Sequence, residues 1–137
     1  MIQHHLYPRI VHAKRYMDTN FGIPIELAGI AEEACISQYH FHRLFKKVYG
    51  YTPHKYLTDK RIAKAKELLS GHDNTLVEIC ALVGFESLGS FCTLFKRQTG
   101  YTPMAYRNLE FQKQAIQKAT PEKVVPHCFA FMFGAVS

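Results

Sequence analysis

The sequence predicts an all-α protein in which two tandem helix-turn-helix units are joined by a long connecting helix. First, the chain repeats itself: residues 37–56 and 87–106 share ten of twenty positions at a fixed offset of 50, where chance would give about one. Second, each copy carries apolar residues at helical spacing, bounded by recognisable helix caps. Third, residues 8–107 contain no convincing strand pattern. Together these features predict a duplicated helical domain over residues 8–107.

The first unit, residues 8–52, is expected to begin with a helix from Pro8 to Asn20 that Phe21-Gly22 ends. A short second helix and a tight break at Cys35-Ile36 follow. Ser37 is then a good N-cap, because its side-chain oxygen can accept from a backbone amide at the start of a helix. The apolar positions of these two helices follow helical spacing: Leu27, Ile30, Ala31 and Ala34, then Phe41, Leu44, Phe45 and Val48.

The connecting helix is predicted over residues 53–71. Gly50 supplies the left-handed residue that ends the preceding helix. Thr52 can cap the new helix, and Pro53 fits its first turn because a proline there loses no hydrogen bond. Gly71 ends the helix, and its inward residues are expected to be Ile62, Ala65, Leu68 and Leu69.

The second unit, residues 72–107, repeats this order. Thr75 and Glu78 form a capping box that opens its first helix, and Gly84-Phe85 is the break. The turn contains one extra residue, Glu86, compared with the first copy. Ser87 then caps a helix that Gly100 ends, and Thr102-Pro103 starts the next. The apolar residues are Leu76, Ile79, Cys80 and Val83, then Phe91, Leu94 and Phe95.

Residues 108–137 lie beyond the repeat, and the sequence assigns them no role. Asn108 to Ala119 is predicted to continue as a polar helix, which Thr120-Pro121 ends. The tail after it, VVPHCFAFMFGAVS, is unusually apolar for a chain terminus. It could fold back onto the helices, contact another chain or a polymerase, or line a small-molecule pocket, since apolar patches often mark interaction sites. The sequence does not separate these three alternatives.

Composition limits the function classes. The 137 residues are 47% hydrophobic and 20% charged, with 17 Lys+Arg against 11 Asp+Glu and a net charge of +6. Such a basic chain suits a polyanion, either nucleic acid or an anionic membrane surface. No secretion signal or membrane-spanning stretch is visible, so a cytoplasmic protein is expected. The spacing of the four cysteines and eight histidines predicts neither a metal nor a cofactor, and no catalytic motif predicts an enzyme.

The placement of charge favours a nucleic acid partner. From Arg43 to Lys66 the chain carries eight basic residues and one acid, Asp59. Such a run is often only a solvated surface. Here it covers a helix-turn-helix and its exit helix, which favours contacts with phosphates. The residues expected to contact the DNA backbone are Ser37, Lys46, Lys47, Lys60, Arg61, Ser87, Lys96 and Arg97.

The outward faces of the two recognition helices differ. The first presents Gln38, Tyr39, His42 and Arg43, whose side chains can hydrogen-bond or pack against base edges in the major groove. On the equivalent second face, Thr93 is the one obvious candidate for a base edge. The sequence therefore predicts asymmetric readout, specific through the first unit and mostly positional or shape-based through the second.

Several stretches resemble the DNA-binding domain of AraC/XylS-type transcription regulators over about residues 8–107. They are the GYTP that closes each unit, IAKAKELL in the connecting helix, and VEICALVGFESLGSFCTLFKRQTGYTPMAYR. The resemblance implies two recognition helices in successive major grooves on one face of DNA. It implies base contacts by Tyr39, His42 and Arg43 in the first unit and by Gly89 and Thr93 in the second.

Cys35 departs from the family pattern, which often has glycine at that position. A left-handed cysteine there would store about 1 kcal/mol of strain. The resemblance also points to the short, stand-alone members of the family, which lack a sensing domain and act according to their abundance.

The leading hypothesis is a non-enzymatic, sequence-specific transcription regulator that binds double-stranded DNA in the nucleoid and contacts RNA polymerase. Its first alternative is a sequence-indifferent, nucleoid-type DNA binder, which the weak second reading face would suit. Its second alternative is a protein–protein adaptor that uses the apolar tail, through which the chain could also self-associate.

Overall fold

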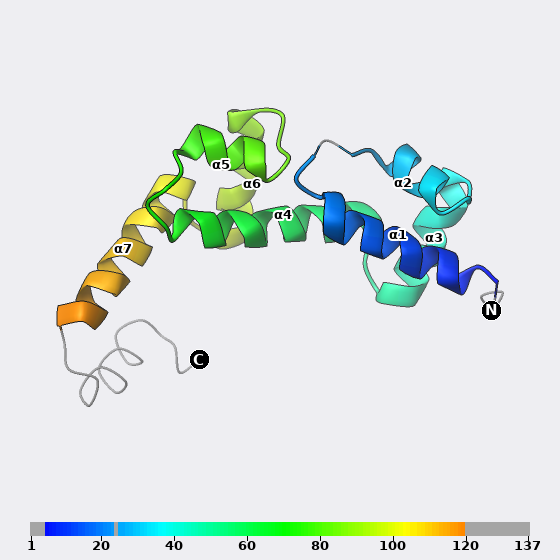
Figure 1. The fold of residues 1–137 in the computed structure, drawn as a ribbon, viewed down its shortest axis with the longest axis horizontal. Helices are drawn as coiled ribbons and strands as arrows, with labels where there is room; N and C mark the ends of the chain where they lie inside the picture. Colours follow the sequence, from blue (N-terminus) through cyan, green and yellow to red (C-terminus); the bar gives the residue numbers. More distant parts are fainter. Residues whose placement is uncertain (1–4, 24, 120–137) are drawn as a thin grey trace.

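The computed structural model describes residues 5–23 and 25–119, and over these residues the chain forms seven helices and no strand. The all-α prediction is therefore confirmed. Figure 1 shows α4 running along the molecule, with α1 to α3 at one end and α5 to α7 at the other. The helices are α1 (Tyr7–Asn20), α2 (Leu27–Glu33), α3 (Gln38–Tyr49), α4 (Pro53–Leu69), α5 (Leu76–Leu82), α6 (Leu88–Thr99) and α7 (Pro103–Ala119).

Each unit has its own hydrophobic core, and α4 contributes to both. Leu57, near the start of α4, is buried in the first core with residues of α1, α2 and α3. Ile62, Ala65 and Leu69, further along α4, are buried in the second core with residues of α5 and α6. The connecting helix is thus the last helix of the first unit and the first helix of the second.

The sequence repeat is also a repeat of side-chain packing. The rings of Phe41 and Phe45 lie edge to face, with centroids 5.7 Å apart and planes at 61°. Phe91 and Phe95, 50 residues later, have the same separation and the same angle. Because the two buried aromatic pairs have the same geometry, α3 and α6 pack on their cores through equivalent apolar stripes.

The predicted caps are present. The Ser37 side chain accepts a hydrogen bond from the His40 amide at 3.3 Å, and the Ser87 side chain accepts one from the Ser90 amide at 3.0 Å. At the other end of each recognition helix the C-cap glycine has φ +83°. These local signals set the bounds of α3 and α6.

Cys35 has φ +57°, so the left-handed conformation expected from the sequence is confirmed. Its counterpart in the second unit, Gly84, has φ +87°. A non-glycine residue in this region costs about 1 kcal/mol or more, because its Cβ approaches the neighbouring carbonyl oxygen. The carbonyl oxygen of Cys35 accepts from Arg9 Nη1 at 3.1 Å, which ties the strained turn to α1.

The helix bounds differ slightly from the sequence predictions. α1 begins one residue earlier, at Tyr7, and α4 ends at Leu69. α7 runs unbroken from Pro103 to Ala119, straight through residues 107 and 108.

The second half of α7 packs against the end of α4. The ring of Phe111 stacks on His72 with centroids 4.2 Å apart, and Gln114 Nε2 donates to the Ser70 carbonyl oxygen at 2.8 Å. Residues 108–119 therefore belong structurally to the second unit. The apolar tail, and every alternative offered for it, lies outside the described residues.

Candidate nucleic-acid interface

The two faces of α3 are chemically distinct. Phe41 and Phe45 are fully buried, which fixes the rotation of the helix on its core. The opposite face presents exposed polar and basic side chains, with the Tyr39 side chain as much as 72% exposed. The sequence-predicted base readers Gln38, Tyr39, His42 and Arg43 all lie on this exposed face, together with Lys46 and Lys47.

Tyr39 and Arg43 form a pair one helical turn apart. Arg43 Nη1 donates to the Tyr39 hydroxyl oxygen at 3.5 Å, and the guanidinium lies 5.7 Å from the Tyr39 ring centroid. A cation over an aromatic ring is attracted to it, and residues at i and i+4 share one face of a helix. The pairing therefore orients the guanidinium at the solvent surface before any ligand is bound.

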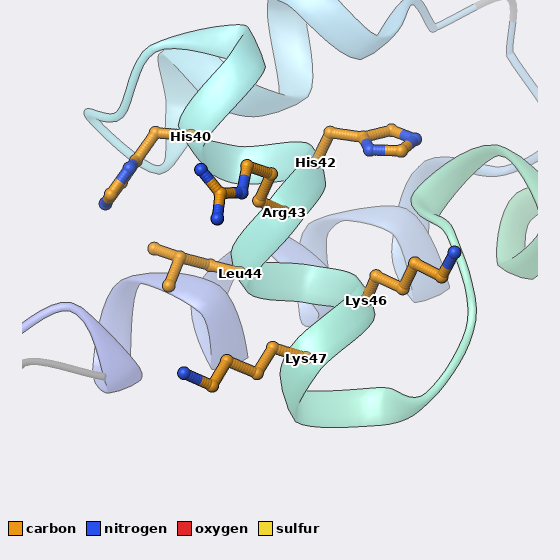
Figure 2. Close-up of a pocket in the computed structure, with 6 residues that line it drawn as sticks. All are labelled: His40, His42, Arg43, Leu44, Lys46 and Lys47. Carbon is orange, nitrogen blue, oxygen red and sulfur yellow. The ribbon is translucent and has the colours of Figure 1, made fainter. Parts of the chain in front are cut away.

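Basic side chains extend from both sides of α3. Figure 2 shows His42 and Lys46 on one side of the helix, His40 and Lys47 on the other, and Arg43 between them. With Leu44, these residues line a shallow hollow of about 670 Å³. A concave surface edged by cationic groups attracts a polyanion. His40 is not among the DNA-contacting residues predicted from the sequence, because its place beside Arg43 depends on helix rotation that residue spacing alone leaves open.

The corresponding face of α6 offers fewer polar groups. Gly89 and Thr93 are exposed and line a hollow of about 450 Å³ with Ser90, Leu94 and Arg97. A Cβ built at Gly89 would meet no atom within 4 Å, so the surface is open at that position. Lys96 and Arg97 are exposed in the last turn of α6. The two units thus present the same framework with different chemistry.

The capping serines sit at the start of these faces. Ser37 and Ser87 are exposed and use their side-chain oxygens to accept from the first turns of α3 and α6. A serine hydroxyl can accept and donate at the same time. Each capping serine therefore keeps a hydroxyl hydrogen that can be donated to a partner such as a phosphate oxygen.

Lys60 and Arg61 lie elsewhere and have partners within the chain. Lys60 Nζ is 3.1 Å from a carboxylate oxygen of Asp18, and both side chains are about one-third exposed. Arg61 donates from Nε to the Phe21 carbonyl oxygen at 2.8 Å and from Nη2 to the Ile23 carbonyl oxygen at 3.0 Å. Both side chains thus have partners within the chain, so we do not propose them as contacts to the DNA backbone.

The basic run from Arg43 to Lys66 is therefore not one continuous face. Lys55 pairs with Asp59 at 2.9 Å, and Lys64 pairs with Glu67 at 3.2 Å. Most cations of α4 thus have a carboxylate or carbonyl partner within the chain. The charge available to a polyanion in this segment is concentrated on α3.

Both recognition helices lie behind other helices in the view of Figure 1. In Figure 1, α3 lies partly behind α1, and α6 lies behind α4 and α5.

Within residues 5–23 and 25–119, no helix is long and apolar enough to cross a bilayer. Over those same ranges, no three His, Cys, Asp or Glu side chains are grouped so as to hold a metal ion.

The fold and its two exposed recognition helices define a class of tandem helix-turn-helix domains. A family described as "helix-turn-helix domain" matches residues 30–109, more than half of the chain. The similar proteins are AraC-type regulators and domains, and this chain belongs to the AraC/XylS family.

Two curated relatives illustrate the match. The bifunctional transcriptional activator/DNA repair enzyme AdaA of Bacillus subtilis is 36% identical over 94 residues, which are 69% of this chain and 44% of AdaA. The probable transcriptional regulator LumQ of Photobacterium leiognathi is 34% identical over 67% of this chain and 37% of its own length. The chain thus spans less than half the length of these relatives.

Solved structures agree on the fold. The C-terminal domain of AraT, a response regulator from Geobacillus stearothermophilus, has a TM-score of 0.72 and 30% identity over 76% of this chain and 87% of that domain. The DNA-binding domain of AdpA in complex with a target DNA has a TM-score of 0.70 over 83% of this chain and 97% of that one. At 24% identity, the AdpA likeness concerns the fold alone.

Proposed function

We propose that this protein is a sequence-specific, DNA-binding transcription regulator that places α3 and α6 in successive major grooves of one duplex. The observation that carries the proposal is the exposed, basic face of α3, where Arg43 is oriented by Tyr39. Membership of the AraC/XylS family and the names of the relatives support it. An α-helix fits the major groove of B-form DNA, where each base pair presents a distinct pattern of donors and acceptors.

The side chains divide into two roles. Gln38, Tyr39, His42 and Arg43 are proposed to contact base edges in the first half-site, because the first turns of a recognition helix meet the bases. Gly89 and Thr93 would face the bases of the second half-site. Neutralisation and hydrogen bonding of phosphates are assigned to Ser37, Lys46, Lys47, Ser87, Lys96 and Arg97.

Base readout is expected mainly from the first unit. Thr93 offers one hydroxyl and Gly89 offers no side chain, whereas α3 presents an arginine that can donate two hydrogen bonds to guanine. The sparse chemistry of α6 also favours a second candidate function, a sequence-indifferent DNA binder. That candidate predicts equal affinity for all duplexes of one length.

A binding titration over a range of salt concentrations tests DNA binding and separates the two candidates. The regulator should lose affinity steeply as salt rises, because bound cations are released when Lys and Arg neutralise phosphates. It should also prefer one promoter fragment over a shuffled duplex of the same length and composition. Affinity that ignores salt contradicts DNA binding through these residues, and equal affinity for both duplexes supports the sequence-indifferent binder.

The remaining assignments follow from this function. We propose double-stranded DNA as the partner, a cytoplasmic location on the nucleoid, and RNA polymerase as a second contact. The name of AdaA includes a repair activity, but the function proposed for this chain uses noncovalent contacts alone and is not enzymatic. Self-association and an adaptor role through the tail concern residues outside those described.

A further inference from the structure

The two units touch each other directly as well as through α4. Figure 1 shows the loop after α1 beside the turn between α5 and α6, next to the middle of α4. The contact is backbone against backbone: a Cβ at Gly22 would lie 2.8 Å from the Leu82 carbonyl oxygen. A Cβ at Gly84 would lie 2.4 Å from the Phe21 carbonyl oxygen. Both distances are shorter than any normal contact, so glycine on each side permits this approach.

One side chain of α4 joins the two sides of this contact. Arg61 donates to the carbonyl oxygens of Phe21 and Ile23, both in the loop of the first unit. Its guanidinium carbon lies 5.9 Å from the ring centroid of Phe85, in the turn of the second unit. The fork of an arginine is planar and its hydrogen bonds are directional. Arg61 therefore constrains the first unit by two hydrogen bonds and the second by stacking.

The residue inserted in the second turn adds to this arrangement. Glu86 lines the cleft between the units together with Arg61 and Gly84. Burial lowers the pKa of the Arg61 guanidinium, and the Glu86 carboxylate raises it. An arginine stays protonated at any physiological pH, so the half-buried charge at the junction has a carboxylate to balance it.

We propose that Arg61 is a positioning residue that fixes the distance and angle between α3 and α6, and through them the spacing of the two DNA half-sites. This inference rests on the proposed function. α4 alone holds each unit by apolar packing, which is not directional. Hydrogen bonds from one guanidinium to two carbonyls of the loop remove the rocking of one unit against the other. Arg61 thus acts on DNA recognition without contacting DNA.

The first experiment measures orientation without DNA. Residual dipolar couplings are recorded for the full chain, as wild type and as Arg61→Met, which keeps an unbranched side chain about as long as the arginine stem and removes the guanidinium with its donors. In the wild type one alignment tensor should fit both units. In Arg61→Met each unit should fit well alone, but the two tensors should differ. A single tensor for both units of the variant overturns the proposal whether or not the protein binds DNA.

The second experiment measures the spacing that the protein requires. The best site selected by the wild type is synthesised with its half-sites one base pair closer, unchanged or one base pair further apart. Adding or removing one base pair shifts a half-site by about 3.4 Å along the duplex and rotates it by about one-tenth of a turn. The wild type should bind the unchanged spacing about tenfold more tightly than either altered one, a difference of about 1.4 kcal/mol. In Arg61→Met this ratio should fall to about threefold or less, with base preference in each half-site retained.

Two further variants separate positioning from stability. Arg107 makes the same type of contact within the second unit, from Nε to the Leu69 carbonyl oxygen at 3.1 Å and from Nη2 to the Asn74 carbonyl oxygen at 2.7 Å. Arg107→Met should lower the unfolding temperature and keep the wild-type spacing ratio. Gly22→Ala keeps Arg61 and pushes the units apart, so it should change the preferred spacing or relax it.

The outcomes are distinguishable from those of the proposed function. If the wild type selects no site, the proposed function fails, and the dipolar couplings alone decide the inference. If Arg61→Met does not fold, the dipolar couplings and the spacing ratio are both measured on Gly22→Ala. Wild-type spacing ratios in every folded variant of this junction overturn the inference even where the protein binds DNA with specificity.

Discussion

Arg43 and Lys47 are exposed basic residues one helical turn apart on α3, yet their surroundings differ. Arg43 is paired with Tyr39 by a hydrogen bond and by the position of its guanidinium against the ring. Lys47 extends from α3 on the same side as His40 in Figure 2. An oriented guanidinium suits bidentate recognition of one base, whereas a flexible ammonium acts as a point charge near phosphates.

Arg43→Ala should weaken binding to the selected site by about 1–3 kcal/mol and relax the preference at one base pair. The measurement is the affinity for the selected site and for its three substitutions at each position. Thr93→Ala, the matched substitution on α6, should cost less specificity. A larger loss from Thr93→Ala would contradict asymmetric readout.

Lys47→Ala should weaken binding to every sequence alike, because a phosphate contact carries no direct sequence information. The slope of log affinity against log salt should become shallower by about one. Affinity titrations at four or more salt concentrations, on the selected site and on a shuffled one, give both quantities. A changed base preference with an unchanged slope would place Lys47 on a base instead.

Asp18 links α1 to α4 and makes stability depend on pH. It accepts a hydrogen bond from the Tyr56 hydroxyl and lies near Lys60 and Lys14. Burial by itself raises the pKa of Asp18, but the hydrogen bonds from Tyr56 and Lys60 and the charges of both lysines lower it overall. A carboxyl whose pKa is lower in the folded state stabilises the fold above its unfolded pKa of about 3.9.

We therefore expect the contribution of Asp18 to be complete above about pH 5 and to be lost as pH falls through the folded pKa. Urea unfolding from pH 3 to 7, compared between the wild type and Asp18→Asn, isolates this contribution from that of other carboxylates. The difference in unfolding free energy should shrink toward acid pH. A difference that is constant across this range would show that Asp18 does not titrate with folding.

Residue roles were predictable from the sequence where they are local. Ser37 and Ser87 cap their helices as expected, because the cap and its partner are three residues apart. The roles of Lys60 and Arg61 were not, since their partners, Asp18 and the Phe21 carbonyl, are about 40 residues away. Charge spacing shows where cations cluster in the chain, but it does not reveal which of them the fold itself uses.

At the scale of an element, the turn between α2 and α3 is strained by Cys35, with φ +57°. Cys35→Gly should stabilise the protein by up to about 1 kcal/mol, because the left-handed strain is relieved. Part of that gain is offset by the greater chain entropy of glycine in the unfolded state. Cys35→Val should destabilise it, since a β-branched residue disfavours this conformation. Thermal unfolding of both variants checks the signs, and a stabilising valine would contradict the strain.

The open surface at Gly89 allows the stability of α6 and its place at the DNA to be tested by substitution. Gly89 is helical and a Cβ there meets nothing within 4 Å. Gly89→Ala should therefore stabilise the protein by about 0.5–1 kcal/mol, because glycine within a helix loses more entropy on folding than alanine does. Gly89→Gln should add a base preference in the second half-site, since glutamine can pair with adenine. Site selection by the glutamine variant with no new preference would contradict the place of Gly89 at the bases.

Elements were predicted well because periodicity and caps act within a few residues. The exception is α7, which runs through the domain boundary predicted between residues 107 and 108. The stacking of Phe111 on His72 and the hydrogen bond from Gln114 to Ser70 bring that segment onto α4. Such pairings between distant residues leave no periodic signal in one sequence.

At the scale of the whole molecule, the tandem arrangement was predictable from the internal repeat, but the fixed relation between the units was not. The repeat predicts two similar units around a shared helix, and the two cores have that organisation. The contact between the units, in which Gly22 and Gly84 approach the opposite backbone and Arg61 donates to the Phe21 carbonyl oxygen, joins residues far apart in the chain. The repeat therefore does not predict it. In the proposed function, this fixed relation lets two units with different exposed faces bind one duplex in a single direction.

The most direct test of this account is selection of bound sites from random double-stranded DNA by the wild-type chain. We expect a motif of two half-sites about one helical turn apart, centre to centre. The stronger base preference should fall in the half-site whose preference Arg43→Ala relaxes. The account would be contradicted if no motif or only a single half-site were enriched. It would also be contradicted if Thr93→Ala, and not Arg43→Ala, relaxed the preference in the stronger half-site.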